Sequence, residues 1–170
     1  MSDWVPVAVA AKRIRDALKA KGWGRRHVSV RAKSYSMGSS ISVTILDVSV
    51  PRAEVETVAN GEEHVDRDEQ GEILSGGNRF VFVDYDRAAL EPLVSRVDAQ
   101  LAGVEATGRA VLTLGGYVAR KLSPGDLGPD TWVASPVGAA SGRHSIHCHG
   151  REFAAAQIVR NAAFLGTVRS

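Results

Sequence analysis

The sequence predicts an α+β fold, in which a small, antiparallel-rich sheet is packed by helices and continued by a C-terminal α/β extension. Two observations lead to this prediction. Residues 28–45 contain two short runs of alternating apolar and polar side chains that meet at a serine and glycine turn, as in a hairpin with one buried face. Residues 5–21 repeat apolar side chains at helical spacing. We place a first domain at residues 1–103 and the extension at residues 104–170.

The composition allows a buried core and argues against a membrane segment. Apolar residues make up 44% of the 170 residues and charged residues 24%, which is ordinary for a globular domain. No apolar run reaches the roughly 18 residues of a membrane span. At the N-terminus the charges follow a short apolar run instead of preceding it, unlike a signal peptide. Cys148 is the single cysteine, so an internal disulfide is excluded and we expect a reducing cytoplasm.

The first elements follow from their side-chain periods. The helix at residues 5–21 is expected to bury Val7, Ala11, Ile14 and Leu18. The two strands are expected to bury Val28, Val30, Ala32, Ile41, Val43 and Ile45. Met37 and Gly38 fall in the turn between them, where we expect Gly38 to adopt a positive φ angle.

A second helix is expected after the hairpin, with Ser49 as its cap and Pro51 at its first position. The acidic, glycine-rich residues 60–78 are typical of an exposed loop. Residues 79–86 read "RFVFVDYD" and are apolar on both faces, which predicts a central strand covered on both sides. A third helix is expected from Asp86 to about Ala102, with Pro92 in its first turns.

The second half of the chain has weaker signals. Residues 109–122 are expected to form two extended pieces, and residues 143–150 another. Residues 123–142 are rich in proline and glycine, which predicts a connector. Residues 151–165 have the pattern of a closing helix.

The small net charge of +2 hides an uneven distribution. Nine basic residues and one acidic residue lie between Lys12 and Lys33, a balance of +8. Nine acidic and two basic residues lie between Asp47 and Glu72, a balance of −7. Two explanations remain open: the basic segment attracts a polyanionic partner, or the acidic segment neutralises it within one domain.

The predicted hairpin places donor groups on one face. Strand alternation puts Arg31, Lys33 and Tyr35 beside Ser40, Ser42 and Thr44, with Arg25 and Arg26 at the edge. Such donors suit phosphate oxygens, and Tyr35, Phe80 and Phe82 are candidates to stack on bases. We therefore expect a surface for nucleic acid or another partner at Arg25, Arg26, Arg31, Lys33, Tyr35 and Ser40. The alternative is an ordinary solvated face, on which Tyr35 pins the turn and the C-terminal segment covers both phenylalanines.

A second cluster has the residue types of a metal site. His144, His147, Cys148 and His149 are four potential ligands for zinc or another divalent transition metal. On one strand His147 and His149 point the same way and Cys148 points oppositely, so a site needs a further ligand such as His64 or an acid of the loop. The alternative is a group of histidines at an exposed edge.

No catalytic residue is assigned from the sequence. Cys148 lies beside two histidines and ahead of a predicted helix start, a setting that lowers a thiol pKa. Single cysteines are nevertheless usually small buried hydrophobic residues, and no catalytic motif flanks this one. The glycine doublets match neither a phosphate-binding loop nor a dinucleotide fingerprint.

The residues Ser29, Val30, Arg31, Tyr35, Ser36, Gly38, Ser39, Ser40, Ile41 and Val43 form a pattern that resembles a known family. It is the large polyvalent protein-associated domain family twenty-nine, which occurs in phages and conjugative plasmids. Met37 stands where that family usually has a glycine. The resemblance covers residues 8–85 and carries no established reaction, whereas residues 104–170 resemble nothing that we can name. It implies a phage or plasmid protein in a bacterial cytoplasm, near incoming DNA or host defence.

The leading prediction is a non-enzymatic accessory protein of a mobile element that binds nucleic acid or a host protein, and the resemblance connects such a host protein with defence. The alternative is a metal-dependent enzyme that uses the cluster from His144 to His149. No cofactor is expected under the first prediction, and a divalent transition metal is expected under the second.

Overall fold

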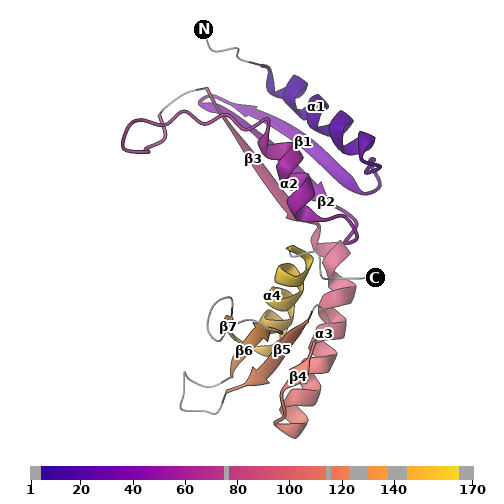
Figure 1. Cartoon of the computed structure of the whole chain (residues 1–170). Helices are drawn as coiled ribbons and strands as arrows, with labels where there is room; N and C mark the ends of the chain where they lie inside the picture. Colours follow the sequence, from indigo (N-terminus) through magenta and orange to yellow (C-terminus); the bar gives the residue numbers. More distant parts are fainter. Residues whose placement is uncertain (1–4, 75–76, 114–115, 123–129, 138–144, 165–170) are drawn as a thin grey trace. The chain divides into compact units, whose positions relative to one another are not determined.

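Figure 1 shows the computed structural model of the chain, which describes residues 5–74, 77–113, 116–122, 130–137 and 145–164. Four helices and two β-sheets are present in these residues, so the predicted α+β fold is confirmed. The chain divides by its contacts into two compact units, Met1–Asp86 and Arg87–Ser170, called unit 1 and unit 2 below. This division falls at the start of the third helix, whereas the sequence places a domain boundary near its end. None of the described helices is long and apolar enough to cross a membrane.

Helix α1 (Val7–Ala20) confirms the first predicted helix. It begins after Pro6, which suits the start of a helix because its fixed φ matches the helical value. Gly22, whose φ is +91°, follows its last turn. The helix buries Ala10, Ala11, Ile14 and Leu18. Three of the four predicted core positions are therefore buried, and Val7 is half-buried.

The sheet of unit 1 has three strands, with β2 (Gly38–Ile45) between β1 (Val28–Tyr35) and β3 (Asn78–Tyr85). β1 pairs antiparallel with β2, as the hairpin pattern predicts. β3 pairs parallel with β2, which requires a crossover connection. Helix α2 (Arg52–Asn60) lies in that connection and packs on β3.

The expected central position of the "RFVFVDYD" strand is wrong, because β3 is an edge strand. Its apolar side chains belong to two different surfaces. Val83 and Tyr85 are buried in the core, whereas Phe82 is 59% exposed on the other side of the sheet. The pattern correctly indicates that both faces of the strand are apolar. The inference that both faces are covered is wrong.

Helices α1 and α2 pack on the same side of this sheet. α1 contacts β1, β2 and α2, and α2 contacts β3 (Figure 1). The strand side chains buried under these helices are Val28, Val30, Ile41, Val43, Ile45, Val83 and Tyr85. The expected burial of Ala32 is wrong, because β1 is exposed from Arg31 onward. No helix of unit 1 covers the opposite side, in the part of the unit that the structure describes.

Both outer edges of the sheet are partly occupied. Beside β3, His64 exchanges two backbone hydrogen bonds with Arg79, and the Val81 N–H donates to the Glu63 carboxylate at 3.3 Å. Beside β1, Arg15 donates from Nε and Nη2 to the Val30 carbonyl at 3.3 and 3.0 Å. Such contacts hinder the addition of another strand, which an unpaired edge would otherwise invite.

Unit 2 contains helix α3 (Arg87–Thr107), an antiparallel sheet and helix α4 (Arg151–Phe164). The sheet order is β4 (Val111–Leu112), β5 (Tyr117–Lys121), β6 (Thr131–Pro136) and β7 (Ile146–His149). α4 packs on β6, β7 and α3, and α3 also contacts β4 and β5. The predicted extended pieces and the closing helix are therefore confirmed.

The predicted connector at residues 123–142 is wrong where the structure describes it. Thr131–Pro136 is strand β6, which pairs with β5 and β7, and Trp132 within it is only 1% exposed. The apolar run "TWVA" is short, and its proline and glycine neighbours are stronger local signals than its own pattern. Burial between two strands and a helix decides its conformation.

A chain of alternating charges joins the elements of unit 2. The Arg151 guanidinium donates to Asp98 and Glu105, both at 2.8 Å. Lys121 continues the chain, since its Nζ lies 2.9 Å from Glu105 and 2.8 Å from Asp130. Hydrogen bonds from Lys121 and Arg151 lower the pKa of Glu105, so this carboxylate stays charged near neutral pH. The network links both helices of the unit to its sheet.

Gly38 is required by a close approach between strands. Its φ of +158° is positive, as the sequence predicts, but it is nearly extended, so a left-handed turn is not the reason for the glycine. A Cβ atom at this position would lie 2.5 Å from the backbone oxygen of Asn78 and 3.3 Å from the Tyr35 ring. The absence of a side chain therefore allows β2 and β3 to pair at their first residues.

We expect Gly38→Ala to lower the free energy of unfolding by about 1–3 kcal/mol, because the Asn78 backbone must move to admit a methyl group. Urea denaturation measures the change. Gly24→Ala is the matched control, since a Cβ there would meet nothing within 4 Å. Equal stability of the two variants would contradict this explanation.

The buried hydroxyl of Tyr85 holds the start of α2. It donates to the Val50 carbonyl at 2.9 Å and accepts from the Arg52 N–H at 3.2 Å. Burial raises the pKa of Tyr85 above its usual value, so the hydroxyl is protonated at neutral pH. The expected Ser49 cap is wrong, because α2 has Pro51 at its cap and no side-chain cap.

Tyr85→Phe should lower the free energy of unfolding by about 1–3 kcal/mol, because the buried Val50 carbonyl and Arg52 N–H lose their partner. Tyr35→Phe, which removes a partly exposed hydrogen bond to the Ser39 carbonyl, should cost less. Thermal and urea unfolding of both variants compare them. A larger loss for Tyr35→Phe would show that the Tyr85 hydroxyl does not anchor α2.

Candidate nucleic-acid interface

The side of the unit 1 sheet opposite α1 and α2, called the open face below, presents three rows of side chains. The strand registers align Ser29 with Thr44 and Asp84, Arg31 with Ser42 and Phe82, and Lys33 with Ser40 and Phe80. The outer strand β1 thus supplies cations, the central strand β2 supplies hydroxyls, and β3 supplies aromatic rings. The sequence predicts the first two columns, and the structure places the third on the same face.

Phe80 and Phe82 form an aromatic pair on the open face. Their ring centroids lie 6.4 Å apart and the ring planes differ by 22°. Phe80 is half-buried, and Phe82 is among the most exposed large apolar side chains of the chain's described part. Such rings normally enter a core, because burial of a phenylalanine contributes about 1.5–3 kcal/mol. Phe82 departs from this rule, since its ring is 59% exposed on the open face.

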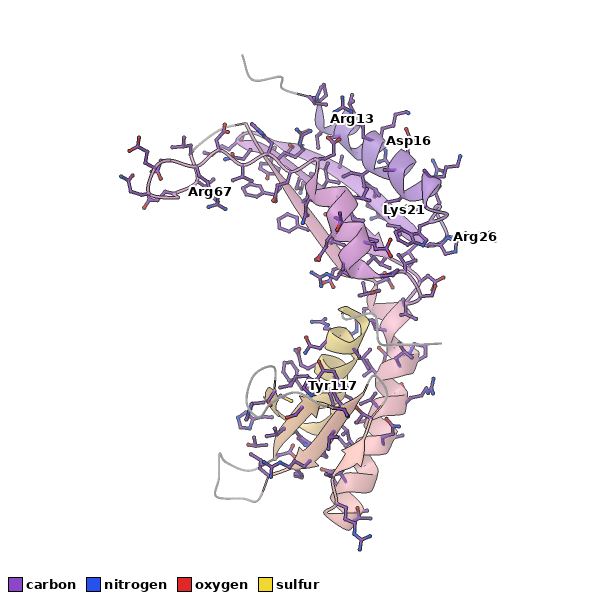
Figure 2. The ribbon with its side chains drawn as sticks, in the orientation of Figure 1. Arg13, Asp16, Lys21, Arg26, Arg67 and Tyr117 are labelled. Atoms are coloured by element: carbon purple, nitrogen blue, oxygen red, sulfur yellow. The ribbon has the colours of Figure 1, made fainter. Side chains whose placement is uncertain are left out.

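Eight of the nine basic residues between Lys12 and Lys33 fall into two groups, and the ninth, Arg15, donates to the Val30 carbonyl. In the paired group, Lys12 pairs with Asp16 at 2.7 Å, Arg13 with Glu62 at 3.7 Å and Lys21 with Glu54 at 3.0 Å. Glu54 and Glu62 belong to the acidic segment, so that segment neutralises part of the basic one. Figure 2 shows Arg13, Asp16 and Lys21 along α1 and Arg26 beyond its end.

The second group has no such partners. Within the residues that the structure places, no acidic group lies within 4.0 Å of these five side chains, which are Lys19, Arg25, Arg26, Arg31 and Lys33. All five are exposed. The two explanations of the charge asymmetry therefore apply to different residues: Lys12, Arg13 and Lys21 are internally paired, whereas Lys19 and the cations of β1 and its preceding loop face solvent.

Two hollows lie near β1 in unit 1, one on the open face and one beside α1. One lies on the open face and is lined by Arg31, Lys33, Ser40, Ser42, Thr44 and Asp86. The other lies between the end of α1 and the start of β1 and is lined by Arg15, Lys19, Trp23, Gly24, Arg25 and Val28. Ser29, Arg31 and Leu46 line both. The two hollows therefore meet these three residues from different sides.

Tyr35 pins the turn, as the alternative interpretation predicts. Its hydroxyl donates to the Ser39 carbonyl at 3.1 Å, and its ring lies against Gly38. The side chain is still 44% exposed at one end of the open face. Ser40 is half-buried between the Lys33 and Phe80 positions. Of the predicted surface residues, Arg31, Lys33, Tyr35 and Ser40 share the face, while Arg25 and Arg26 lie in the preceding loop.

Sequence reasoning missed several residues of this surface. Lys19 and Trp23 lie near the end of α1 and Leu46 follows β2, so none belongs to the strand alternation that reveals Arg31 and Lys33. Ser29 lies two residues before Arg31 in the same alternation, so the sequence pattern places it on the same face. The convergence of these four residues depends on how α1 packs beside β1.

The predicted metal cluster is only partly brought together. His144 lies outside the described residues. His147 and His149 are exposed on one side of β7, and Cys148 is buried on the other, as strand alternation predicts. His149 Nδ1 lies 3.2 Å from the Thr131 hydroxyl. Over the described ranges, no three His, Cys, Asp or Glu side chains gather as a metal site would require, so metal binding stays a prediction.

The surroundings of Cys148 do not suit a nucleophile. The residue is 7% exposed, and burial raises the pKa of its thiol. A catalytic thiol needs the opposite shift. The proximity of the α4 start, which suggests a lowered pKa in the sequence, is outweighed by burial.

No family model, curated protein or solved structure matches the chain. The resemblance to the mobile-element family therefore stays a prediction carried by the hairpin residues alone.

We expect Cys148 to react slowly with a thiol-specific disulfide reagent in the folded protein and rapidly in guanidinium chloride, because only unfolding exposes the thiol and restores its usual pKa. Absorbance of the released chromophore follows the reaction. Equal rates in both conditions would show that the thiol is accessible in the native state.

Proposed function

We propose that unit 1 binds single-stranded nucleic acid on its open face. The observation that carries the proposal is the exposed Phe80–Phe82 pair on the same face as the unpaired cations Arg31 and Lys33. Base–aromatic stacking contributes about 1–3 kcal/mol per base and accepts any base, since every base has a π-face. Two neighbouring rings on a sheet are a known way to hold successive unpaired bases.

The spacing of the columns suits one nucleic-acid strand. β1 and β3 are separated by β2, and adjacent strands lie about 4.8 Å apart, so cations and rings start about 10 Å apart. The long side chains of Arg31 and Lys33 shorten the distance to a phosphate. A backbone that runs along β1 can then turn its bases across Ser40 and Ser42 toward Phe82 and Phe80. The serine hydroxyls donate to and accept from sugar or base atoms on the way.

The same geometry disfavours a duplex. In a duplex the base faces are stacked on one another, so exposed rings on a sheet have nothing to stack on. Readout of duplex DNA usually places a helix or a two-stranded ribbon in the major groove. The two helices of unit 1 are instead packed on the far side of the sheet.

The proposed biological setting is that of a non-enzymatic accessory protein of a phage or plasmid, which rests on the hairpin resemblance. A binder without sequence preference suits a protein that meets incoming DNA, because stacking and phosphate contacts carry little sequence information. The alternatives are a host-protein partner and a metal-dependent enzyme. Neither is favoured by a specific feature of the described residues, since the candidate metal ligands do not converge there.

The test measures binding of a fluorescent oligothymidine or oligouridine of about 15 nucleotides by anisotropy. We expect Phe82→Ala to weaken binding about tenfold or more, because it removes a stacking surface. Phe153→Ala is the matched control, as that ring is similarly exposed, at 56%, but belongs to unit 2. Arg31→Ala with Lys33→Ala should also weaken binding and reduce the salt slope by about 0.7 for each phosphate that no longer meets a cation.

Lys12→Ala with Arg13→Ala is the control for charge. It removes as many cations as the strand variant, but from side chains that are paired with Asp16 and Glu62. A drop in affinity equal to that of the strand variant would show only a general electrostatic effect. Absence of binding to any single strand at low salt, or equal affinity for a duplex, would overturn the proposal.

A further inference from the structure

The electrostatics of unit 1 are asymmetric at the end of the open face where β1 begins. At this end β3 finishes with Asp84 and Tyr85, and Asp86 follows and lines the hollow of the open face. Beyond the other edge of the sheet, next to β1, Lys19 and Arg25 line the second hollow beside α1. A polyanion that reaches this end is repelled from the β3 side and attracted to the β1 side.

The carboxylates on the two sides are not equivalent. Asp16, which also lines the second hollow, accepts a hydrogen bond from Lys12 at 2.7 Å, and this bond lowers the pKa of Asp16. Its charge is therefore paired. The Asp84 side chain is 70% exposed, and its nearest cation is Arg52 at 3.7 Å. Asp84 therefore also has a cationic partner, but this contact is longer than that between Asp16 and Lys12, so the carboxylate on the β3 side is the less neutralised of the two.

Two arginines lie at the edge of β1 beside the second hollow, Arg15 and Arg31. Two Arg15 nitrogens bond the Val30 carbonyl, which fixes the guanidinium at the outer edge of β1. Arg31 lines both hollows and has no acidic partner in the part of the chain that is described. Trp23 gives the second hollow an aromatic wall that is half-buried. The chemistry of this hollow therefore repeats that of the open face: cations beside a ring.

We infer that a bound single strand leaves the open face across Ser29 and Arg31 and continues into the hollow between α1 and β1, where Lys19 and Arg25 hold its phosphates. This inference rests on the proposed function and adds the path of the strand. It assigns a second subsite to residues that lie off the sheet. The affinity of the protein for a single strand is therefore expected to depend on the length of that strand.

The experiment compares two labelled oligothymidines, of about 4 and about 12 nucleotides, which fall within the range that one small domain covers. The variant is Lys19→Ala with Arg25→Ala, and the control is Arg13→Ala with Arg67→Ala, which removes two exposed cations that line neither hollow. For the longer strand, we expect the variant to lose affinity and to reduce the salt slope by about 1.4, because two phosphates no longer meet a cation. For the shorter strand, we expect variant and wild type to bind equally. Circular dichroism and thermal unfolding check that each variant is folded.

Failure of this inference differs from failure of the proposed function. If the longer strand binds with the dependence on Phe82 but without dependence on Lys19 and Arg25, the second subsite is wrong and the open face remains. If both strands lose affinity equally, the two cations act through the general field and the path is also wrong. If wild-type protein binds neither strand at low salt, both proposals are wrong.

Discussion

The pairing register of β2 is the constraint on which the rest of unit 1 depends. All 8 of its residues pair with β1 on one side and with β3 on the other. Because side chains alternate, a slip of one residue would move Ile41 and Val43 out of the core and bring serines into it. The close approach of Gly38 to Asn78 sets where β2 and β3 start, and the Tyr35 hydroxyl holds the turn that sets β1. The same register aligns cations, hydroxyls and rings on the open face, so stability and the proposed function rest on one arrangement.

Charged and apolar side chains are distributed differently on the two sides of that sheet. On the helix side, Lys12, Arg13 and Lys21 are paired with acids of α1, of the loop after α2 and of α2, which limits repulsion where elements pack. On the open face, Arg31 and Lys33 face solvent, and Phe82 is exposed although burial would stabilise the fold. Fold stability alone does not explain an aromatic pair at this position, because exposed rings stabilise a fold less than buried ones do. The exposure of an aromatic ring beside unpaired cations on one face is the physical basis of the proposed function.

Unit 2 shows a different way of holding a small fold together. Trp132 and the alanine-rich side of α4 form a compact core, and the charge network from Asp98 to Asp130 links its helices to its sheet. Exposed ion pairs of this kind contribute little individually, but a connected network restrains geometry. The exposed histidines of β7 and the buried Cys148 fit this structural picture, since the thiol faces the core.

Local pattern alone determined α1, the β1–β2 hairpin, the helix in the crossover and the split of His147 and His149 from Cys148, because periods of 3.6 and 2 are visible in the chain itself. It also identified Arg31, Lys33, Tyr35 and Ser40 as one surface. Only the tertiary structure decided that β3 is an edge strand with Phe80 and Phe82 uncovered, because alternation shows which side chains share a face and not what packs on it. For the same reason the sequence did not predict β6, because its burial comes from neighbours that are distant in sequence. It also did not predict the hollow lined by Lys19, Trp23 and Arg25, which exists because α1 lies beside β1.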